Sequence, residues 1–261
     1  MGGKLVFITG ASSGIGQALA MRYYQAGWSL ALAARRTGAI EQWARASGVS
    51  PDRLMIYTAD VADLDSIVDA GRACMIRQGV PDRVIANAGV SFGIDTAVRE
   101  DLDGMQDLFA VNTVGMAATF HPFVEPMRAR GSGTLVGIAS VTGIRGLPGH
   151  GGYCASKAAA ISYCESLRGE MRGSGVKVVT LCPGYVDTPL TSGDTHSKPF
   201  MLSPGQFAER AFRAIEAGTS YRVIPWQMAI VAKLLRLMPN ALFDAVLADR
   251  PRKPRRKTAR R

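Results

Sequence analysis

Short apolar runs alternate along the chain with segments of helical periodicity, and this alternation limits the fold more than any other feature. Residues 14–27, after the first run, repeat their apolar side chains every three or four positions, as an amphipathic helix does. The runs are apolar throughout, which is typical of strands buried on both faces of a parallel sheet. An α/β fold with helices on both faces is therefore expected. Seven strands are predicted, at residues 4–9, 29–34, 54–59, 83–88, 134–139, 176–181 and 221–225.

The chain shows no internal repeat and no linker-like segment before Arg250, so residues 1–249 are predicted to form one catalytic domain. Within it, residues 226–249 extend beyond the last expected strand as a helical extension. Residues 250–261 read RPRKPRRKTARR, with eight basic residues and no acid, and are expected to be a disordered tail. Of the formal net charge of +10, only +2 is left for the domain (10 − 8). Nucleic-acid binding through the tail is an alternative, but a basic terminus that contains proline is more typical of a disordered, solvated tail.

A glycine-rich loop, TGASSGIG at residues 9–16, connects the first predicted strand to a helix. Gly10, Gly14 and Gly16 let the backbone turn tightly and bring its N–H groups against a pyrophosphate at the helix N-terminus. The spacing differs from G-x-G-x-x-G, but the place between first strand and first helix is that of a dinucleotide site. The chain is therefore predicted to be a single doubly wound Rossmann-type domain with a seven-stranded, mostly parallel sheet.

The end of the second predicted strand indicates which dinucleotide is bound. A site for NAD carries a carboxylate there for the ribose 2′-hydroxyl, whereas this chain has Ala33, Ala34, Arg35 and Arg36. Two guanidinium groups can bind a 2′-phosphate through paired hydrogen bonds. The alternative is a solvated arginine pair without a ligand. The pattern favours NADP(H).

Tyr153 and Lys157 lie four residues apart in YCASK, at the start of a strong helical pattern, so their side chains share one helix face. A phenol with its usual pKa near 10 is a poor acid–base catalyst at neutral pH, and a nearby ammonium group favours the phenolate. A pKa lower by three units would need about 4 kcal/mol. Ser140 ends the fifth predicted strand, and strand ends are where α/β sheets present their sites.

The motifs occur in the order TGASSGIG, Asp60-Val61, NAG at 87–89, Asn112, Ser140, YCASK and PGYVDT at 183–188. With this order, the chain resembles the short-chain dehydrogenases/reductases over about residues 4–225. The resemblance implies that Tyr153 gives a proton to a carbonyl oxygen held by Ser140 while NADPH delivers hydride. Lys157 would then bind the nicotinamide ribose and lower the tyrosine pKa, and Asn112 would help to relay protons to Lys157.

The resemblance also implies a set of cofactor contacts. Asp60 should touch the adenine, Asn87 the adenosine side, and Val186 and Thr188 the carboxamide. No metal site is expected, because the three histidines are scattered. The expected cofactor-binding residues are Gly10, Ser12, Ser13, Gly14, Ile15, Gly16, Arg35, Arg36, Asp60, Val61, Asn87, Ala88, Gly89, Tyr153, Lys157, Pro183, Gly184, Val186 and Thr188.

The expected function is an NADPH-dependent oxidoreductase that interconverts a ketone or aldehyde and the corresponding alcohol. The segment 188–205 has little charge and contains Phe200, Met201 and Leu202, which favours an apolar or lipid-like substrate. The alternative is a non-catalytic NADP(H)-binding regulatory protein. The complete set of four catalytic residues argues against it.

The helical extension places Trp226, Ile230, Leu234 and Leu237 on one stripe, with basic residues beside it. Such a helix, followed by a basic tail, could contact an anionic membrane surface peripherally, or it could pack on the domain or on a partner subunit. The resemblance implies a homo-oligomer, either a dimer or a tetramer. Four cysteines without metal or redox spacing, and no signal peptide, favour reduced thiols and a cytoplasmic location.

Overall fold

The computed structural model describes residues 3–192, 198–248 and 253–255. Its seven strands form one parallel sheet in the order β3-β2-β1-β4-β5-β6-β7, which confirms the predicted α/β architecture. Each predicted apolar run forms a strand, and the predicted and observed ends agree to within two residues. The strands are β1 Leu5–Thr9, β2 Ser29–Ala34, β3 Leu54–Thr58, β4 Arg83–Ala86, β5 Gly133–Ile138, β6 Val176–Pro183 and β7 Tyr221–Ile224.

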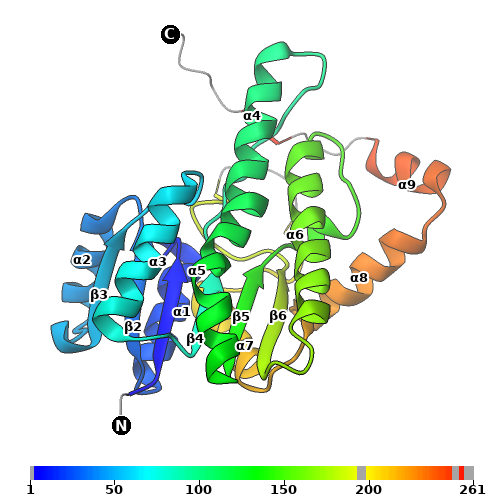
Figure 1. Ribbon diagram of the computed structural model, residues 1–261. Helices are drawn as coiled ribbons and strands as arrows, with labels where there is room; N and C mark the ends of the chain where they lie inside the picture. The colour runs from blue at the N-terminus through cyan, green and yellow to red at the C-terminus, as the bar shows by residue number, and fades with distance from the viewer. Residues whose placement is uncertain (1–2, 193–197, 249–252, 256–261) are drawn as a thin grey trace.

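Helices cover both faces of the sheet, and α3, α5 and α6 lie in front of it in Figure 1. α1 packs against α7 on one face, and α3 packs against α5 on the other. The α-helices of the domain are α1 Gly14–Gln25, α2 Thr37–Ala46, α3 Leu64–Gln78, α4 Arg99–Phe109, α5 Gly115–Arg130, α6 Gly151–Glu170, α7 Pro204–Glu216, α8 Trp226–Leu237 and α9 Asn240–Leu247. Short helical turns are η1 Pro51–Arg53, η2 Ala110–Val114 and η3 Val141–Gly143.

The continuous apolar character of the strands follows from this double coverage. In β1, Val6 and Ile8 belong to the core on the α1 and α7 side, whereas Leu5 and Phe7 belong to the core on the α3 and α5 side. All four side chains are buried, because successive residues of a strand point to opposite faces. Burial of one such side chain contributes roughly 1.5–3 kcal/mol.

The sheet changes its direction of growth at β1. The chain first adds β2 and β3 on one side of β1 and then adds β4 to β7 on the other. Loops that leave the carboxyl ends of β1 and β4 therefore diverge, and a crevice opens between them. This crevice is where the predicted site residues are expected to meet.

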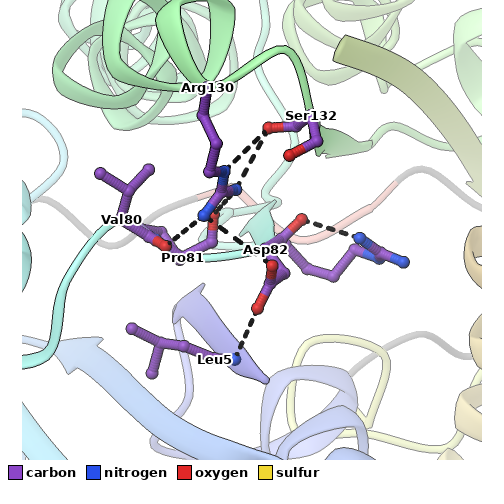
Figure 2. A network of polar contacts seen from close by, with 7 residues as sticks. Leu5, Val80, Pro81, Asp82, Arg130 and Ser132 are labelled. Carbon is purple, nitrogen blue, oxygen red and sulfur yellow. Dashed lines mark hydrogen bonds and ion pairs between the residues drawn. The ribbon is translucent and has the colours of Figure 1, made fainter. Parts of the chain in front are cut away.

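A polar network around Arg130 and Asp82 lies at the amino ends of the central strands, opposite the crevice (Figure 2). Arg130, at the end of α5, donates hydrogen bonds to the carbonyls of Val80 and Pro81 at 2.7 and 2.8 Å. The Asp82 carboxylate accepts a 2.9 Å hydrogen bond from the Leu5 N–H. The network fixes the starts of β1 and β4, at the ends of these strands that lie away from the crevice.

The helical extension forms α8 and α9, which reach to one side of the domain (orange in Figure 1). Arg145 holds it by donating hydrogen bonds to the carbonyls of Leu235 and Met238 at the end of α8, and its guanidinium lies over the ring of Phe243. The predicted apolar stripe of α8 points away from the domain: Trp226, Ile230, Leu234 and Leu237 are 51–81% exposed. None of the described helices combines the length and apolar character that a membrane span requires.

Residues 253–255, which we call the C-terminal strap, lie against the domain. The Gly93 N–H donates a 2.9 Å hydrogen bond to the Pro254 carbonyl, and Gly93 and Arg255 form a parallel β-bridge. At these three residues the structure therefore differs from the predicted disordered tail. The remaining residues of the predicted tail, 250–252 and 256–261, lie outside the described part of the chain.

The four cysteines are buried, and no disulfide joins them, as their apolar surroundings predict. Burial raises the pKa of Cys74 and Cys164 to about 12 and that of Cys182 to about 11. Thiols with such values carry little thiolate at neutral pH and are unreactive.

Candidate active site

A cleft of about 400 Å³ lies at the carboxyl ends of the central strands. It includes the crevice between β1 and β4 and extends from it in both directions. The predicted site residues gather there, although they come from widely separated parts of the chain. Gly16 and Asn112 are the two that do not line its surface and lie behind it. The predicted residues that do line it are Gly10, Ser12, Ser13, Gly14, Ile15, Arg35, Arg36, Asp60, Val61, Asn87, Ala88, Gly89, Ser140, Tyr153, Lys157, Pro183, Gly184, Val186 and Thr188.

The glycine loop has no room for side chains at its key positions. Gly10 and Gly14 adopt left-handed backbone angles, with φ of +66° and +58°, which residues other than glycine rarely adopt. At Gly16, a Cβ atom would lie 2.4 Å from the Gly10 carbonyl oxygen and 2.5 Å from Nδ2 of Asn87. The loop is therefore a bare backbone surface at the N-terminus of α1, which suits a pyrophosphate.

Thr9 and Asn87 fasten this loop to the end of β4. The Thr9 hydroxyl accepts hydrogen bonds from the N–H groups of Asn87 and Ala88 at 3.1 and 3.2 Å. The Asn87 amide in turn donates to the carbonyls of Thr9 and Gly10 at 3.0 and 3.2 Å. Asn87 thus holds the loop in shape. The role of Thr9 was missed from the sequence, where its side chain looks like any other strand residue.

Arg35 and Arg36 lie at the outer end of the cleft, after β2. Arg35 forms a 3.6 Å ion pair with Asp60, and its side chain is 68% exposed. Asp60 is also the only carboxylate among the described residues that line the cleft. This end of the cleft therefore presents two guanidinium groups, and that of Arg35 is ion-paired with the Asp60 carboxylate.

Lys157 is buried at the inner end of the cleft, with only 4% of the residue exposed. Its ammonium group donates a 2.8 Å hydrogen bond to the Ile138 carbonyl at the end of β5. Burial lowers the pKa of Lys157 to about 8, because the charged form loses its hydration. The lysine comes from the second turn of α6, and Tyr153 precedes it by one turn in the same helix.

Asn112 lies in a π-helical turn between α4 and α5. Its Oδ1 accepts a 2.9 Å hydrogen bond from the Val90 N–H, and its Nδ2 donates to the Val90 carbonyl and the Ser156 hydroxyl, both at 3.0 Å. Single π-turns are frequent at functional sites. Here the turn lets one amide bind both the loop after β4 and helix α6, next to Tyr153 and Lys157.

Ser140 follows β5 and begins the short turn η3. Its hydroxyl accepts hydrogen bonds from the N–H and the hydroxyl of Thr142, at 3.2 and 2.9 Å. Thr142 therefore orients Ser140, a contact that the sequence did not reveal. His150 is buried just before α6, where its ring lies 3.2 Å from the Pro148 carbonyl.

The strap borders the substrate end of the cleft, which sequence reasoning also missed. The Lys253 ammonium lies over the Tyr153 ring, 5.9 Å from its centroid. It donates hydrogen bonds to the Ser91 hydroxyl at 2.8 Å and to the Leu190 carbonyl at 3.5 Å. Leu190 and Val90, the neighbour of Ser91, line the cleft. A residue from the far end of the chain thus lies beside the predicted catalytic tyrosine.

A cleft at the switch point of a parallel sheet, with a glycine cradle on the first helix, defines the Rossmann-type dinucleotide-binding proteins. The residues present fit such a group, because the glycine loop lines the cleft from Gly10 to Ile15 and the cleft continues from it to Arg35 in one direction and to Tyr153 in the other.

Comparison with known proteins identifies the family within this class. Residues 4–198 match the family model described as short chain dehydrogenase. An uncharacterized oxidoreductase from Myxococcus xanthus is 35% identical over 93% of this chain and 95% of its own. The chain belongs to the short-chain dehydrogenase family.

Solved structures of relatives agree with this assignment. A short-chain dehydrogenase/reductase from Burkholderia phymatum, in complex with NAD, has a TM-score of 0.81 with 25% identity over 97% of this chain and 98% of its own. An alcohol dehydrogenase from Thermococcus sibiricus, complexed with 5-hydroxy-NADP, has a TM-score of 0.74 with 28% identity over 85% of this chain and 95% of its own. A nicotinamide dinucleotide is therefore the cofactor class of this family.

Proposed function

We propose that the protein is an NADPH-dependent oxidoreductase that interconverts a ketone or aldehyde and an alcohol, with Tyr153 as the general acid and base. The observation that carries this proposal is the meeting of Ser140, Tyr153 and Lys157 at one end of the cleft. Asn112 lies directly behind them. Regulatory binding of a dinucleotide would not require this set.

The bound cofactor supplies hydride to the carbonyl carbon, or accepts it from the alcohol. Ser140, held by Thr142, orients the substrate oxygen by a hydrogen bond, and Tyr153 gives that oxygen its proton. The buried Lys157 ammonium favours the phenolate form of Tyr153 electrostatically. Positioned acid–base catalysis of this kind typically contributes about 10²–10⁴-fold.

A buried lysine with a pKa of about 8 suits this task. Its ammonium is hydrogen-bonded to the Ile138 carbonyl, so it is held at a fixed place below the tyrosine. Proton release from Tyr153 toward Lys157 would run along the polar groups beside Asn112. The Ser156 hydroxyl accepts a hydrogen bond from Asn112 and donates one to the Tyr153 carbonyl at 2.8 Å, so it holds Asn112 against the first turn of α6.

We further propose a preference for NADP(H) over NAD(H). Arg35 and Arg36 line the outer end of the cleft, where the 2′-phosphate of NADP(H) would lie. No carboxylate stands at the end of β2 to bind the free 2′-hydroxyl of NAD(H). The relatives differ in this respect, since one was solved with NAD and another with 5-hydroxy-NADP.

The substrate end of the cleft supports a mainly apolar substrate. Val90, Pro189 and Leu190 line it, and Phe200 and Met201 are exposed on the connection between β6 and α7, to which Pro189 and Leu190 also belong. The proposed function is therefore reduction of an apolar carbonyl compound. Homo-oligomerisation, a cytoplasmic location and peripheral membrane contact through residues 226–261 stay predictions.

The test is the variant Tyr153→Phe, with Tyr163→Phe on the same helix as the matched control. Tyr163 packs against Phe120 in the core and does not line the cleft. With a panel of aliphatic, steroid-like and acyl-chain ketones, Tyr153→Phe should lose at least about 10²-fold in kcat and retain NADPH binding. The control should keep both. Undiminished turnover in Tyr153→Phe would contradict the mechanism, and NADPH binding without turnover of any ketone by the intact protein would favour a regulatory role.

A further inference from the structure

The strap is fastened to the domain at several independent points. Arg255 donates two hydrogen bonds to the Asp101 carboxylate, at 2.5 and 2.9 Å. The Asp101 side chain is only 7% exposed, and it also accepts a 2.7 Å hydrogen bond from the Asp95 N–H. The hydrogen bond from Arg255 holds the pKa of the Asp101 carboxyl below its usual value. A buried carboxylate that lost this partner would be costly, so Arg255 has a specific seat.

The backbone of the strap is fitted just as closely at Gly93. A Cβ atom at Gly93 would lie 2.2 Å from the Lys253 carbonyl oxygen, so only glycine allows the strap to approach this near. The N–H of Gly93 is bonded to the Pro254 carbonyl. Two anchors thus follow Lys253 directly, and together they fix the direction in which its side chain leaves the backbone.

That side chain points to the reacting end of the cleft. Its ammonium contacts Ser91, which follows β4, and Leu190, which follows β6, and lies over the ring of Tyr153. The Leu190 contact is a long 3.5 Å, so this donor can turn to a better acceptor without breaking the contact to Ser91. Lysine has three donors to share in this way.

Charge at this end of the cleft is positive. Lys157 and Lys253 contribute two ammonium groups next to Tyr153, whereas Asp60, the carboxylate among the described lining residues, lies at the far end beside Arg35. Lys253 itself lines a neighbouring cavity of about 230 Å³ together with Asp95 and Arg255, and its ammonium reaches the cleft through its contacts with the Leu190 carbonyl and the Tyr153 ring. An anionic group of a substrate placed beside Tyr153 would therefore lie within reach of the Lys253 ammonium.

We propose that Lys253 is a substrate-binding residue that recognises a carboxylate on the carbonyl substrate, held a few carbon–carbon bonds from the reacting carbonyl. The proposal rests on the proposed carbonyl reduction and narrows its substrate class to apolar oxo acids. The apolar lining around Leu190 accepts the hydrocarbon part, the Ser140–Tyr153 pair the carbonyl, and Lys253 the acid group. Arg255, Asp101 and Gly93 are positioning residues, because they act through the strap.

Kinetics with paired substrates test this directly. The probes are oxo acids whose carboxylate lies one to four bonds from the ketone, each compared with its uncharged methyl ester. A hydrogen bond to a charged group corresponds to about ten- to a hundredfold in binding. The intact enzyme should prefer one of the acids over its ester, and Lys253→Met should lower kcat/KM for that acid by about this factor while the ester changes less than about twofold.

Three control variants separate binding from structure. Lys253→Arg should keep part of the preference, and Lys233→Met, which removes an exposed lysine on α8, should keep all of it. Asp101→Asn should loosen the seat of Arg255 and lower the preference through KM, with kcat for the ester unchanged. Equal rates for acid and ester in the intact enzyme, an equal loss for both in Lys253→Met, or a gain for both would each overturn the proposal.

Binding measured without turnover keeps the inference separate from the proposed function. Calorimetry with hexanoate and with uncharged hexanamide, on protein saturated with NADP⁺, should show tighter binding of the acid, and this difference should disappear in Lys253→Met. If no ketone is reduced but the difference is found, the proposed function fails and the carboxylate site stands. If ketones are reduced but the difference is absent, the carboxylate site fails alone.

Discussion

Replacing Arg35 with alanine is the sharpest test of the cofactor preference, because the structure places this residue in a defined electrostatic setting. Its guanidinium lies 3.6 Å from the Asp60 carboxylate at the outer end of the cleft. The variant Arg35→Ala removes one donor group for the 2′-phosphate. It also leaves Asp60 without its cation, so a phosphate placed there would face an unpaired carboxylate. Both effects weaken NADPH binding.

The magnitude follows from exposure. Hydrogen bonds to charged groups contribute about 1.5–3 kcal/mol, but the Arg35 side chain is 68% exposed and solvent screens it. We therefore take the lower value, about 1.5 kcal/mol, which corresponds to roughly a tenfold rise in Kd for NADPH. NADH has no 2′-phosphate, so its Kd should change by less than about twofold. Arg36→Ala should act in the same direction, and the double variant should lose most of the preference.

Cofactor fluorescence titrations at two salt concentrations provide the assay. The NADPH affinity of the intact protein should fall with added salt more steeply than its NADH affinity, and this difference should be smaller in Arg35→Ala. Arg45→Ala, an exposed arginine at the far end of α2 paired with Glu41, is the matched control. Equal losses for NADPH and NADH would refute the assignment of Arg35 to the 2′-phosphate, as would an unchanged ratio.

Two further predictions concern Lys157 and the outward stripe of α8. Because burial lowers the pKa of Lys157 to about 8, the unfolded chain binds more protons than the folded one between about pH 8 and 10.5, and the stability contributed by this group rises with pH there. In urea unfolding of the cofactor-free protein, the free energy of unfolding at neutral pH should therefore be higher for Lys157→Met than for the native protein. The difference between the two free energies should become smaller as pH rises, and a difference independent of pH would contradict the lowered pKa. The exposed stripe Trp226, Ile230, Leu234 and Leu237 predicts flotation with anionic liposomes, lost when Trp226 and Leu234 are both replaced with serine; absence of flotation by the intact protein would remove the membrane prediction.

The strands and the motif residues could be predicted because they depend on local patterns. A continuous apolar run such as residues 29–34 indicates a strand that is buried on both faces. In the structure, helices on the two faces of the sheet provide this burial. The glycine loop was equally readable, since Gly10 and Gly14 occupy backbone angles that few other residues reach. These features need no knowledge of distant contacts.

The strap could not be predicted, because its place depends on contacts between distant residues. Arg255 reads as one more charge in a basic terminus, and Asp101 as one of several acids at the start of a helix. Only the fold brings them together across 154 positions. The π-turn at Asn112 likewise follows from the hydrogen bonds of its side chain to Val90 and Ser156, and no helix propensity distinguishes it from a regular turn.

The seating of the strap also bears on how the protein can be handled and redesigned. The network around Arg130 and Asp82 fixes the amino ends of β1 and β4, whereas Lys253 lies beside Tyr153 at the carboxyl ends of the strands. Changes to three residues near the end of the chain could therefore alter selectivity while the sheet and its packed helices stay as they are. For the same reason, purified material is better tagged at the amino end, which leads into β1, so that the contacts of residues 253–255 stay as they are.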